Sequence, residues 1–394
     1  MQNFLRIFLL LALTVTTATT VSAQIGTIDV RANNKVILVR VSSPSAELND
    51  LAQRAFGAHG LYKVTAGSVY AYDIRFTSVG ATQVRVDISK GTAPFASSTV
   101  TGTSARNALL RAADFAVEKT NGIGLKGFFT ARLASIGTRT GKPEIYTSDL
   151  FFGEVKQITH DNAFALMPRW SPDGSKLLYT SFFKSGAPDI FQIDLRSSQR
   201  TTFVSFRGTN SSARYSPNGQ QVAMVLSGEG TPEIYISNAQ GRQVSRKTRS
   251  DAVKSSPCFS PDGSRVVFAM EPGPQLYVMS TAGGPVSRVS SGFTYCAEPD
   301  WSRTNPNKIA FTVMQGRNFQ IAVLDLSTRQ SQKVSKAPFD GVEPSWLADG
   351  RHLVYTARTA STSRICILDT ETGTSVPISP TSLGQMQSAN VWTP

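Results

Sequence analysis

An aromatic residue recurs about every 44 residues through the last two thirds of the chain, and this repeat constrains the fold more than any other feature. We call these positions anchors: they are Trp170, Tyr215, Phe259, Trp301, Trp346 and Trp392, and they include all four tryptophans of the chain. A period of roughly 40 to 50 residues is typical of β-propeller blades, each of which contains four short strands.

A tight turn follows most of the anchors. The turns are residues 171–174, 216–219, 260–263 and 347–350, and each ends in Asp-Gly or Asn-Gly. These pairs tolerate the positive φ angles of a hairpin, so each turn predicts a reversal of the chain between two strands. Prolines also recur two residues before four anchors, at Pro168, Pro257, Pro299 and Pro344. We expect each of them to begin a strand, where proline removes no ladder hydrogen bond.

A second repeat runs in phase with the anchors. Its units begin at Glu144, Asp189, Glu233, Gln275, Gln320 and Arg364, and each is followed by a turn and a short strand. The two repeats together predict a six-bladed β-propeller. Residues 129–159 lack a preceding anchor, whereas Trp392 has almost no chain after it. We therefore expect residues 390–393 to supply the innermost strand of the blade formed by residues 129–159, which would close the ring.

The first residues have the pattern of a cleaved secretory signal. Residues 1–23 carry one charge, Arg6, followed by an apolar run at 7–15 and small residues at Val21 and Ala23. An uncleaved membrane anchor is the alternative, but the apolar run is shorter than the roughly 20 residues that span a bilayer. The sequence therefore predicts a signal peptide at 1–23 and export from the cytoplasm.

Residues 24–125 do not carry the repeat. They contain apolar or alternating stretches at 36–41, 70–76 and 83–89, which predict strands. Two stretches, 45–58 and 104–120, place apolar residues at helical spacing, and Ser104 is the expected cap of the second. This region is predicted to be a small α/β domain, followed by the propeller at residues 126–394.

The chain is basic, with 40 Lys and Arg against 27 Asp and Glu and a formal net charge of +13. The densest basic run comprises Arg242, Arg246, Lys247, Arg249 and Lys254. Such a run could contact an acidic protein or an anionic envelope surface, although a solvated face is the favoured interpretation. No nucleic-acid-binding motif accompanies it, so nucleic acid is not an expected partner.

Residues that could perform catalysis are few. The histidines are His59, His160 and His352, widely separated and without metal-ligand spacing. The cysteines, Cys258, Cys296 and Cys366, fit buried thiols better than a disulfide framework. The turn residues Asp173, Asn218, Asp262 and Asp349 could converge on a cation, but their glycine neighbours favour a role in the turns. We therefore expect no catalytic residue, metal or cofactor.

The order of segments and the anchor motifs at residues 168–177 and 257–263 closely resemble the TolB family of periplasmic propeller proteins. The resemblance includes residues 118–123, which are similar to the last helix of the family before the ring. It implies a non-enzymatic, monomeric adaptor of the Tol-Pal system that supports outer-membrane integrity and cell division. The implied partners are the peptidoglycan-associated lipoprotein, bound at one mouth of the propeller, and TolA, bound by the N-terminal segment. The lipoprotein would also link the protein peripherally to the outer membrane.

The resemblance also implies which residues contact the lipoprotein. The family's contact loops lie just before the anchor strands, and the corresponding residues here are Thr209, Asn210, Ser211, Ser255 and Ser256, with Glu298 and Glu343 as additions. Two alternatives remain open. One is an exported propeller that binds another ligand, such as a glycan. The other is a lyase or hydrolase with its site in the channel, which predicts His, Arg and carboxylate side chains converging on one mouth.

Overall fold

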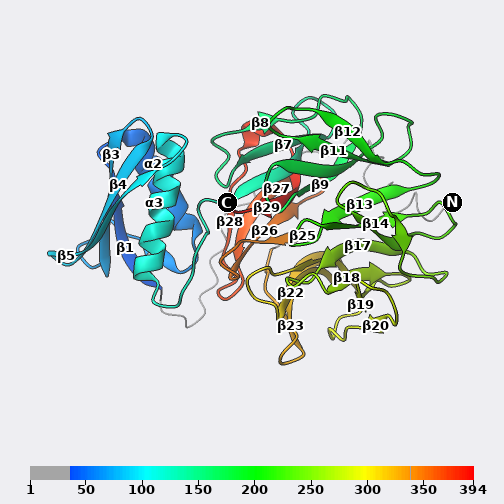
Figure 1. The fold of residues 1–394 in the computed structure, drawn as a ribbon. Coiled ribbons are helices and arrows are strands. Elements are labelled where there is room, and N and C mark those ends of the chain that lie inside the picture. Colours follow the sequence, from blue (N-terminus) through cyan, green and yellow to red (C-terminus); the bar gives the residue numbers. More distant parts are fainter. Residues whose placement is uncertain (1–35, 338) are drawn as a thin grey trace.

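The computed structural model describes residues 36–394 except residue 338. Within that part of the chain, a five-stranded sheet with two helices is followed by a ring of six four-stranded sheets (Figure 1). The protein is therefore mainly β, with a six-bladed β-propeller preceded by a small α/β unit, as the repeat predicts. No helix in the described residues is long and apolar enough to cross a membrane. The predicted signal peptide at 1–23 lies outside the described residues.

The small unit packs both helices on one twisted sheet. Its elements are β1 (Ile37–Ser42), α2 (Ala46–Ala58), β2 (Tyr62–Val64), β3 (Tyr72–Gly80), β4 (Gln83–Lys90), β5 (Ala93–Thr101) and α3 (Ala105–Thr120). The strand order is β2-β1-β3-β4-β5, and β1 is parallel to both of its neighbours. The hydroxyls of Ser45 and Ser104 accept hydrogen bonds from the backbone N of Leu48 and Asn107, as expected of helix caps.

Two strands of this sheet were not predicted. β2 has only three residues, and β5 exposes or half-exposes every one of its residues. β2 is too short to show a pattern, and β5 lacks the apolar alternation that identifies a half-buried strand in a sequence. The predicted boundary after residue 125 falls between the end of α3 and the first propeller strand, β6, which begins at Arg132.

Each blade has four antiparallel strands. Blade 1 contains β9 (Ala165–Trp170), β10 (Lys176–Ser181), β11 (Asp189–Asp194) and β12 (Arg200–Val204); blade 2 contains β13 (Asn210–Tyr215), β14 (Gln221–Leu226), β15 (Glu233–Asn238) and β16 (Ser245–Arg246); blade 3 contains β17 (Lys254–Phe259), β18 (Arg265–Met270), β19 (Gln275–Ser280) and β20 (Ser287–Arg288). Blade 4 contains β21 (Cys296–Trp301), β22 (Lys308–Gln315), β23 (Asn318–Asp325) and β24 (Gln330–Lys333); blade 5 contains β25 (Asp340–Trp346), β26 (His352–Arg358), β27 (Ser363–Asp369) and β28 (Ser375–Pro377). A short 3-10 helix, η1 (Thr381–Leu383), leads to the last strand.

Blade 6 combines the two ends of the ring, as predicted. The last strand, β29 (Met386–Trp392), pairs antiparallel with β6 (Arg132–Gly137), which is followed by β7 (Glu144–Asp149) and β8 (Lys156–Gln157). The side chain of Asn390 then accepts a hydrogen bond from the backbone N of Trp170 in blade 1 at 3.0 Å. The C-terminal strand therefore joins the two ends of the propeller.

The prediction that Trp392 is the sixth anchor is wrong by one residue. Val391 pairs with Leu133 in the same way as Trp170 pairs with Leu177, so Val391 occupies the anchor position of blade 6. The side chain of Trp392 instead packs on Trp170 and donates its indole N–H to the carbonyl of Pro172 at 3.0 Å. A neighbouring aromatic residue at nearly the same spacing concealed this shift in the sequence.

The turn after the first anchor shows why its residues recur. The Ser171 hydroxyl accepts from the backbone N of Lys176 at 2.9 Å and donates to the Asp173 carboxylate at 2.5 Å. Gly174 has a φ of 69°, and a Cβ at this position would lie 2.3 Å from the Trp392 ring. Glycine is therefore required both for the backbone angle and for the closure of the ring.

The small unit contacts one side of the ring, on blades 5 and 6. Phe128, Phe129 and Leu347 belong to one apolar core with the buried faces of α2 and α3. Arg106 of α3 forms a bidentate ion pair with Asp149 at the end of β7. We call the face of the propeller that carries the turns after the anchors, and that contacts the small unit, the proximal face. The opposite face, where the innermost strands begin, is the distal face.

Candidate functional site

All six innermost strands contain the same irregularity, a β-bulge at which the pairing register shifts. At each bulge one residue other than glycine has a φ between 53° and 57°: Met167, Ser212, Ser256, Glu298, Glu343 and Ser388. We call these six residues the bulge ring. Neighbours touch from blade to blade, since Ser212 Oγ lies 3.2 Å from Met167 Sδ and the Glu343 backbone N lies 2.9 Å from Glu298 Oε2. Such backbone conformations are costly, and they aim side chains where regular strands would not.

The bulges also correct the expectation for the prolines. Pro168 does not begin β9 but is its fourth residue, directly after the bulge at Met167. Pro257, Pro299 and Pro344 occupy the same place in their strands. The bulge leaves the proline nitrogen outside the ladder, so the strand continues through it without losing a hydrogen bond.

Two carboxylates of the bulge ring lie next to each other in the channel. Burial and the neighbouring Glu343 carboxylate raise the pKa of Glu298 to about 7. Hydrogen bonds to Glu298 from Thr312 Oγ1 at 2.7 Å and from the Glu343 backbone N at 2.9 Å oppose that rise. Glu343 in turn accepts from the hydroxyls of Thr356 and Ser388. Both carboxylates are therefore held by donors of this chain and link blades 4, 5 and 6.

The predicted contact residues lie where the innermost strands begin, but they are not equally accessible. Thr209, Ser255 and Ser256 are half-exposed. Asn210 and Ser211 are buried, at 0% and 4% relative exposure. The Asn210 amide bridges backbone groups of its own loop and of residue 188, so it shapes the loop rather than presenting a surface. Whether any of the seven residues contacts a partner stays a prediction.

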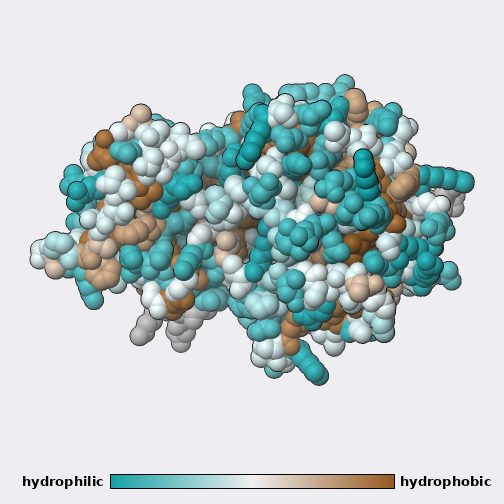
Figure 2. Space-filling view, viewed as in Figure 1, coloured by the Kyte–Doolittle hydropathy of each residue, from teal (hydrophilic) through white to brown (hydrophobic). Residues whose placement is uncertain are grey.

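Large apolar side chains are exposed on the distal face, and the sequence analysis did not identify them. In the described part of the propeller, five large apolar residues are exposed: Phe164, Phe183, Phe206, Val286 and Met314. All except Val286 lie at the distal end of a strand or in a loop that joins strands at that end. Brown patches interrupt the hydrophilic surface of the propeller in Figure 2. The same signal exists in the sequence, since Phe164 directly precedes the innermost strand β9 and Phe206 lies in the loop before β13.

The basic run at 242–254 is only partly a free surface. Lys254 is 1% exposed, and its ammonium group lies 2.8 Å from the Glu233 carboxylate. Arg246 pairs with the same Glu233 and with Glu229. These two cations therefore stabilise blade 2 and the start of blade 3.

Two histidines that are far apart in the sequence meet where the small unit contacts the propeller. The rings of His59 and His352 are 4.4 Å apart, and the potential ligand atoms of these residues and Asp349 lie within 4.8 Å of one another. Hydrogen bonds within the protein explain most of the positions of these side chains. His352 Nδ1 lies 2.6 Å from Asp349 Oδ2, and His352 Nε2 accepts from the Gly60 backbone N at 3.2 Å. We assign the group to the contact between the two units.

The turn carboxylates and the cysteines have structural roles. Hydrogen bonds from the hydroxyls of Ser171 and Ser175 lower the pKa of Asp173 to about 2, which fits a residue that organises its own turn. Asn218 and Asp262 make equivalent turn contacts. All three cysteines are free and buried, as predicted.

Comparisons with known proteins agree with this architecture. A family model described as the TolB beta propeller domain matches residues 119–394. Proteins named Tol-Pal system protein TolB from Bordetella pertussis, Bordetella parapertussis and Bordetella bronchiseptica are each 30% identical to this chain over 232 residues. These alignments cover 58% of this chain and 50% of each relative, so the chain matches about half the length of these curated relatives.

Solved structures show the fold over a longer stretch. The crystal structure of TolB from Acinetobacter baumannii matches with a TM-score of 0.80 and 21% identity, covering 93% of this chain and 99% of that one. A chain of the nidogen/laminin complex matches with a TM-score of 0.55 and 10% identity, covering 66% of this chain and 98% of that one. The second match shows that the fold alone does not specify a function.

Proposed function

This chain belongs to the TolB β-propeller family, and from that premise we propose that it is a non-enzymatic adaptor of the Tol-Pal system that binds a partner protein on its distal face. The proposed partner is the peptidoglycan-associated lipoprotein, and the proposed setting is the periplasm. Through this contact the protein would support outer-membrane integrity and constriction during cell division. The names of the curated relatives and the order of the two structural units support the assignment.

The observation that carries the proposal is the concentration of exposed apolar side chains on the distal face. Phe164, Phe183, Phe206 and Met314 are between 42% and 52% exposed. Isolated exposed apolar residues are common, but a group of aromatic residues on the loops of one rigid face is typical of a protein-binding surface. The half-exposed hydroxyls of Thr209 and Ser255 on the same face would add hydrogen bonds around this apolar centre.

The basic side chains on this face favour a partner with some acidic character. The Arg200 guanidinium lies 4.1 Å from the centre of the Phe183 ring, and it also pairs with Asp161. Arg207 is exposed in the loop that carries Phe206. An aromatic residue next to an arginine is a frequent centre of binding energy in protein interfaces.

The channel-enzyme alternative predicts histidine, arginine and carboxylate groups at one mouth. The structure separates the histidines from the channel carboxylates: Glu298 and Glu343 lie in the bulge ring, whereas His59 and His352 lie at the contact between the two units. The raised pKa of Glu298 is a feature found at catalytic sites, but burial beside Glu343 accounts for it here. A second proposed partner, TolA, would bind through the N-terminal segment, which lies outside the described residues.

Binding of the purified soluble domain of the peptidoglycan-associated lipoprotein, measured by calorimetry, tests the proposal. Phe206→Ser should weaken binding at least tenfold, since aromatic centres of interfaces contribute about 2 kcal/mol or more. Val286→Ser is the matched control, because it makes the same kind of change at an exposed residue away from the distal face.

A second pair of variants tests the predicted hydroxyl positions. Ser255→Arg should obstruct the interface, and Ser287→Arg, on the exposed outer strand of the same blade, should not. Failure of the folded parent protein to bind, or equal losses in each variant and its control, would contradict the proposal.

A further inference from the structure

The residues directly before the anchor positions form a second ring, closer to the proximal face than the bulge ring. We call it the pre-anchor ring, and it consists of Arg169, Arg214, Cys258, Asp300, Ser345 and Asn390. At four positions the side chain accepts a hydrogen bond from the anchor backbone N of the next blade. These contacts are Trp170 to Asn390 at 3.0 Å, Trp301 to Cys258 at 3.2 Å, Trp346 to Asp300 at 2.8 Å and Val391 to Ser345 at 3.2 Å.

The two arginines depart from this pattern. A guanidinium group has no acceptor atom, so Arg169 and Arg214 cannot make the contact that joins the other blades. Arg214 instead donates to Asp300 at 2.8 Å, and Arg169 donates to the carbonyl of Pro168 at 2.9 Å. Residues that interrupt a repeated structural contact are candidates for a function that the repeat itself does not need.

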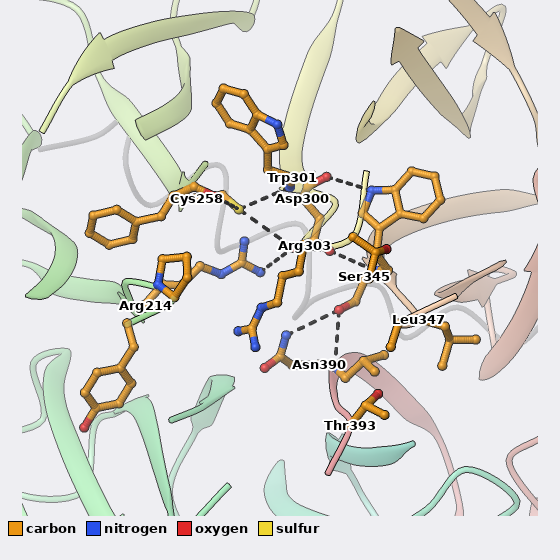
Figure 3. Close-up of a pocket in the computed structure, with 16 residues that line it drawn as sticks. Arg214, Cys258, Asp300, Trp301, Arg303, Ser345, Leu347, Asn390 and Thr393 are labelled. Carbon is orange, nitrogen blue, oxygen red and sulfur yellow. Dashed lines mark hydrogen bonds and ion pairs between the residues drawn. The ribbon is translucent and has the colours of Figure 1, made fainter. Parts of the chain in front are cut away.

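A third arginine enters the same region from a turn. Arg303 occupies the position held by Pro172, Pro217 and Pro261 in the turns of blades 1 to 3. Figure 3 shows the side chains of Arg214 and Arg303 extending into one pocket, with the Asn390 amide close to the end of Arg303. Arg303 is exposed to solvent, and among the described residues it forms no ion pair or hydrogen bond.

The space between these groups is a cavity of about 130 Å³. The residues around it include the polar Ser345, Asn390 and Thr393 and the apolar Trp301 and Trp346. Thr393 Oγ1 is buried and has no hydrogen-bond partner among the described residues. A buried hydroxyl without a protein partner indicates that a water or ligand atom meets it.

The charges of the pocket are unequal. Its lining contains two guanidinium groups, Arg214 and Arg303, and one carboxylate, Asp300, which already accepts from Arg214 and from the backbone of Trp346. Outside the lining, Arg169 is repelled by Arg214 and attracted by Asp300 and then by Glu343 of the bulge ring. Desolvation by the surrounding protein, and then repulsion from Arg214, lower the pKa of Arg303, and the Asp300 carboxylate partly opposes that fall. One negative charge in the cavity would balance the charges of its lining.

We propose that this pocket at the proximal end of the channel binds a carboxylate group, held between the guanidinium groups of Arg214 and Arg303. Guanidinium forks match the planar geometry of a carboxylate, and one carboxylate supplies the missing charge. The cavity is several times the roughly 30 Å³ occupied by one water molecule, so it accommodates a carboxylate with its first waters. The carboxylate could belong to a free organic acid or to an acidic peptide.

Titration of the full-length mature protein with succinate, and separately with tetraglutamate, tests the proposal. Trp301 and Trp346 are among the residues around the pocket, so we expect binding to change the intrinsic tryptophan fluorescence. Arg303→Gln should weaken binding about ten- to a hundredfold, as expected for the loss of hydrogen bonds to a charged group. Arg303→Lys should retain an intermediate affinity, since it keeps the positive charge but loses the paired donors of the planar guanidinium group. Arg242→Gln, at an exposed arginine in another blade, is the control for net charge.

The unliganded variant provides a second readout. Arg303→Gln should melt no earlier than the parent protein, because it relieves repulsion and removes no contact; a merely structural Arg303 would lower the melting temperature. Tighter binding of tetraglutamate would assign the carboxylate to a peptide, and tighter binding of succinate to a free acid. The proposal would be overturned if succinate and tetraglutamate changed the fluorescence only as much as sodium chloride does at the same ionic strength, or if Arg303→Gln left their affinity unchanged. Arg303→Gln should bind the lipoprotein at the distal face as tightly as the parent protein does. The proposal for the carboxylate pocket can therefore be refuted without refuting the proposal for the distal face, and the reverse is also true.

Discussion

The histidine contact between the small unit and the propeller predicts that mild acid weakens the protein at this contact. His59 and His352 are both fully buried, and His59 Nε2 has no hydrogen-bond partner among the described residues. Burial, and then the electrostatic interaction with His352, lower the pKa of His59 well below its usual value. Asp349 and Asp369 partly oppose this effect, and Arg351 adds to it.

The direction of the pH dependence follows from the lowered pKa. The unfolded chain binds a proton at His59 near pH 6.5, whereas the folded protein does not, so the stabilisation is complete above about pH 6.5 and is lost as the pH falls. For one proton the free energy of unfolding should decrease by about 1.4 kcal/mol per pH unit below that value. The fall continues until the folded protein itself takes up the proton.

His59→Phe isolates this contribution. Phenylalanine suits the surroundings, because His59 packs between the rings of Tyr62, Phe128 and Phe129. Urea unfolding at several pH values between 7 and 5 should show the parent protein losing stability more steeply than the variant, by about 1.4 kcal/mol per pH unit. Parallel pH profiles for the two proteins would refute the reasoning.

Two further predictions concern buried charges in the propeller. Lys254→Met should lower the free energy of unfolding by about 3–5 kcal/mol, because it leaves the Glu233 carboxylate buried without its closest cation. Urea denaturation measures this free energy, and a loss of about 1 kcal/mol or less would contradict the assigned ion pair. Glu298→Gln should be more stable than the parent protein above pH 7. Because the pKa of Glu298 is raised, the free energy of unfolding of the parent falls by up to about 1.4 kcal/mol per pH unit as the pH rises from the usual range of a glutamate towards 7. Identical thermal-melting profiles of the two proteins from pH 5 to 8 would contradict this.

The blades could be predicted because each repeat must bury the same faces and reverse at the same turns. Trp170, Gly174 and the strands around them are found where the periodicity places them. The misassignment of Trp392 shows the limit of this reasoning, since a shift of one residue in a strand is visible only in the pairing register. The bulges were missed because they depend on backbone angles, although the prolines after them were a sequence signal.

The groups that define the candidate sites were harder to predict. His59 and His352 come from different structural units, and nothing in their local sequence indicates that they meet. Arg169 and Arg214 could have been identified by comparing the residues directly before each anchor, where other blades have hydrogen-bond acceptors. That comparison requires knowing that the position forms an acceptor contact between blades, and this follows only from the structure.

The central claim, that a partner protein binds the distal face, is tested most directly by hydrogen–deuterium exchange of the protein with and without the peptidoglycan-associated lipoprotein. The account predicts slower exchange in the loops at residues 205–212 and 253–257 when the lipoprotein is bound. Exchange should be unchanged in the proximal turns at residues 171–175 and 302–305. Protection confined to the proximal turns, or no protection on either face under conditions of saturating lipoprotein, would contradict it.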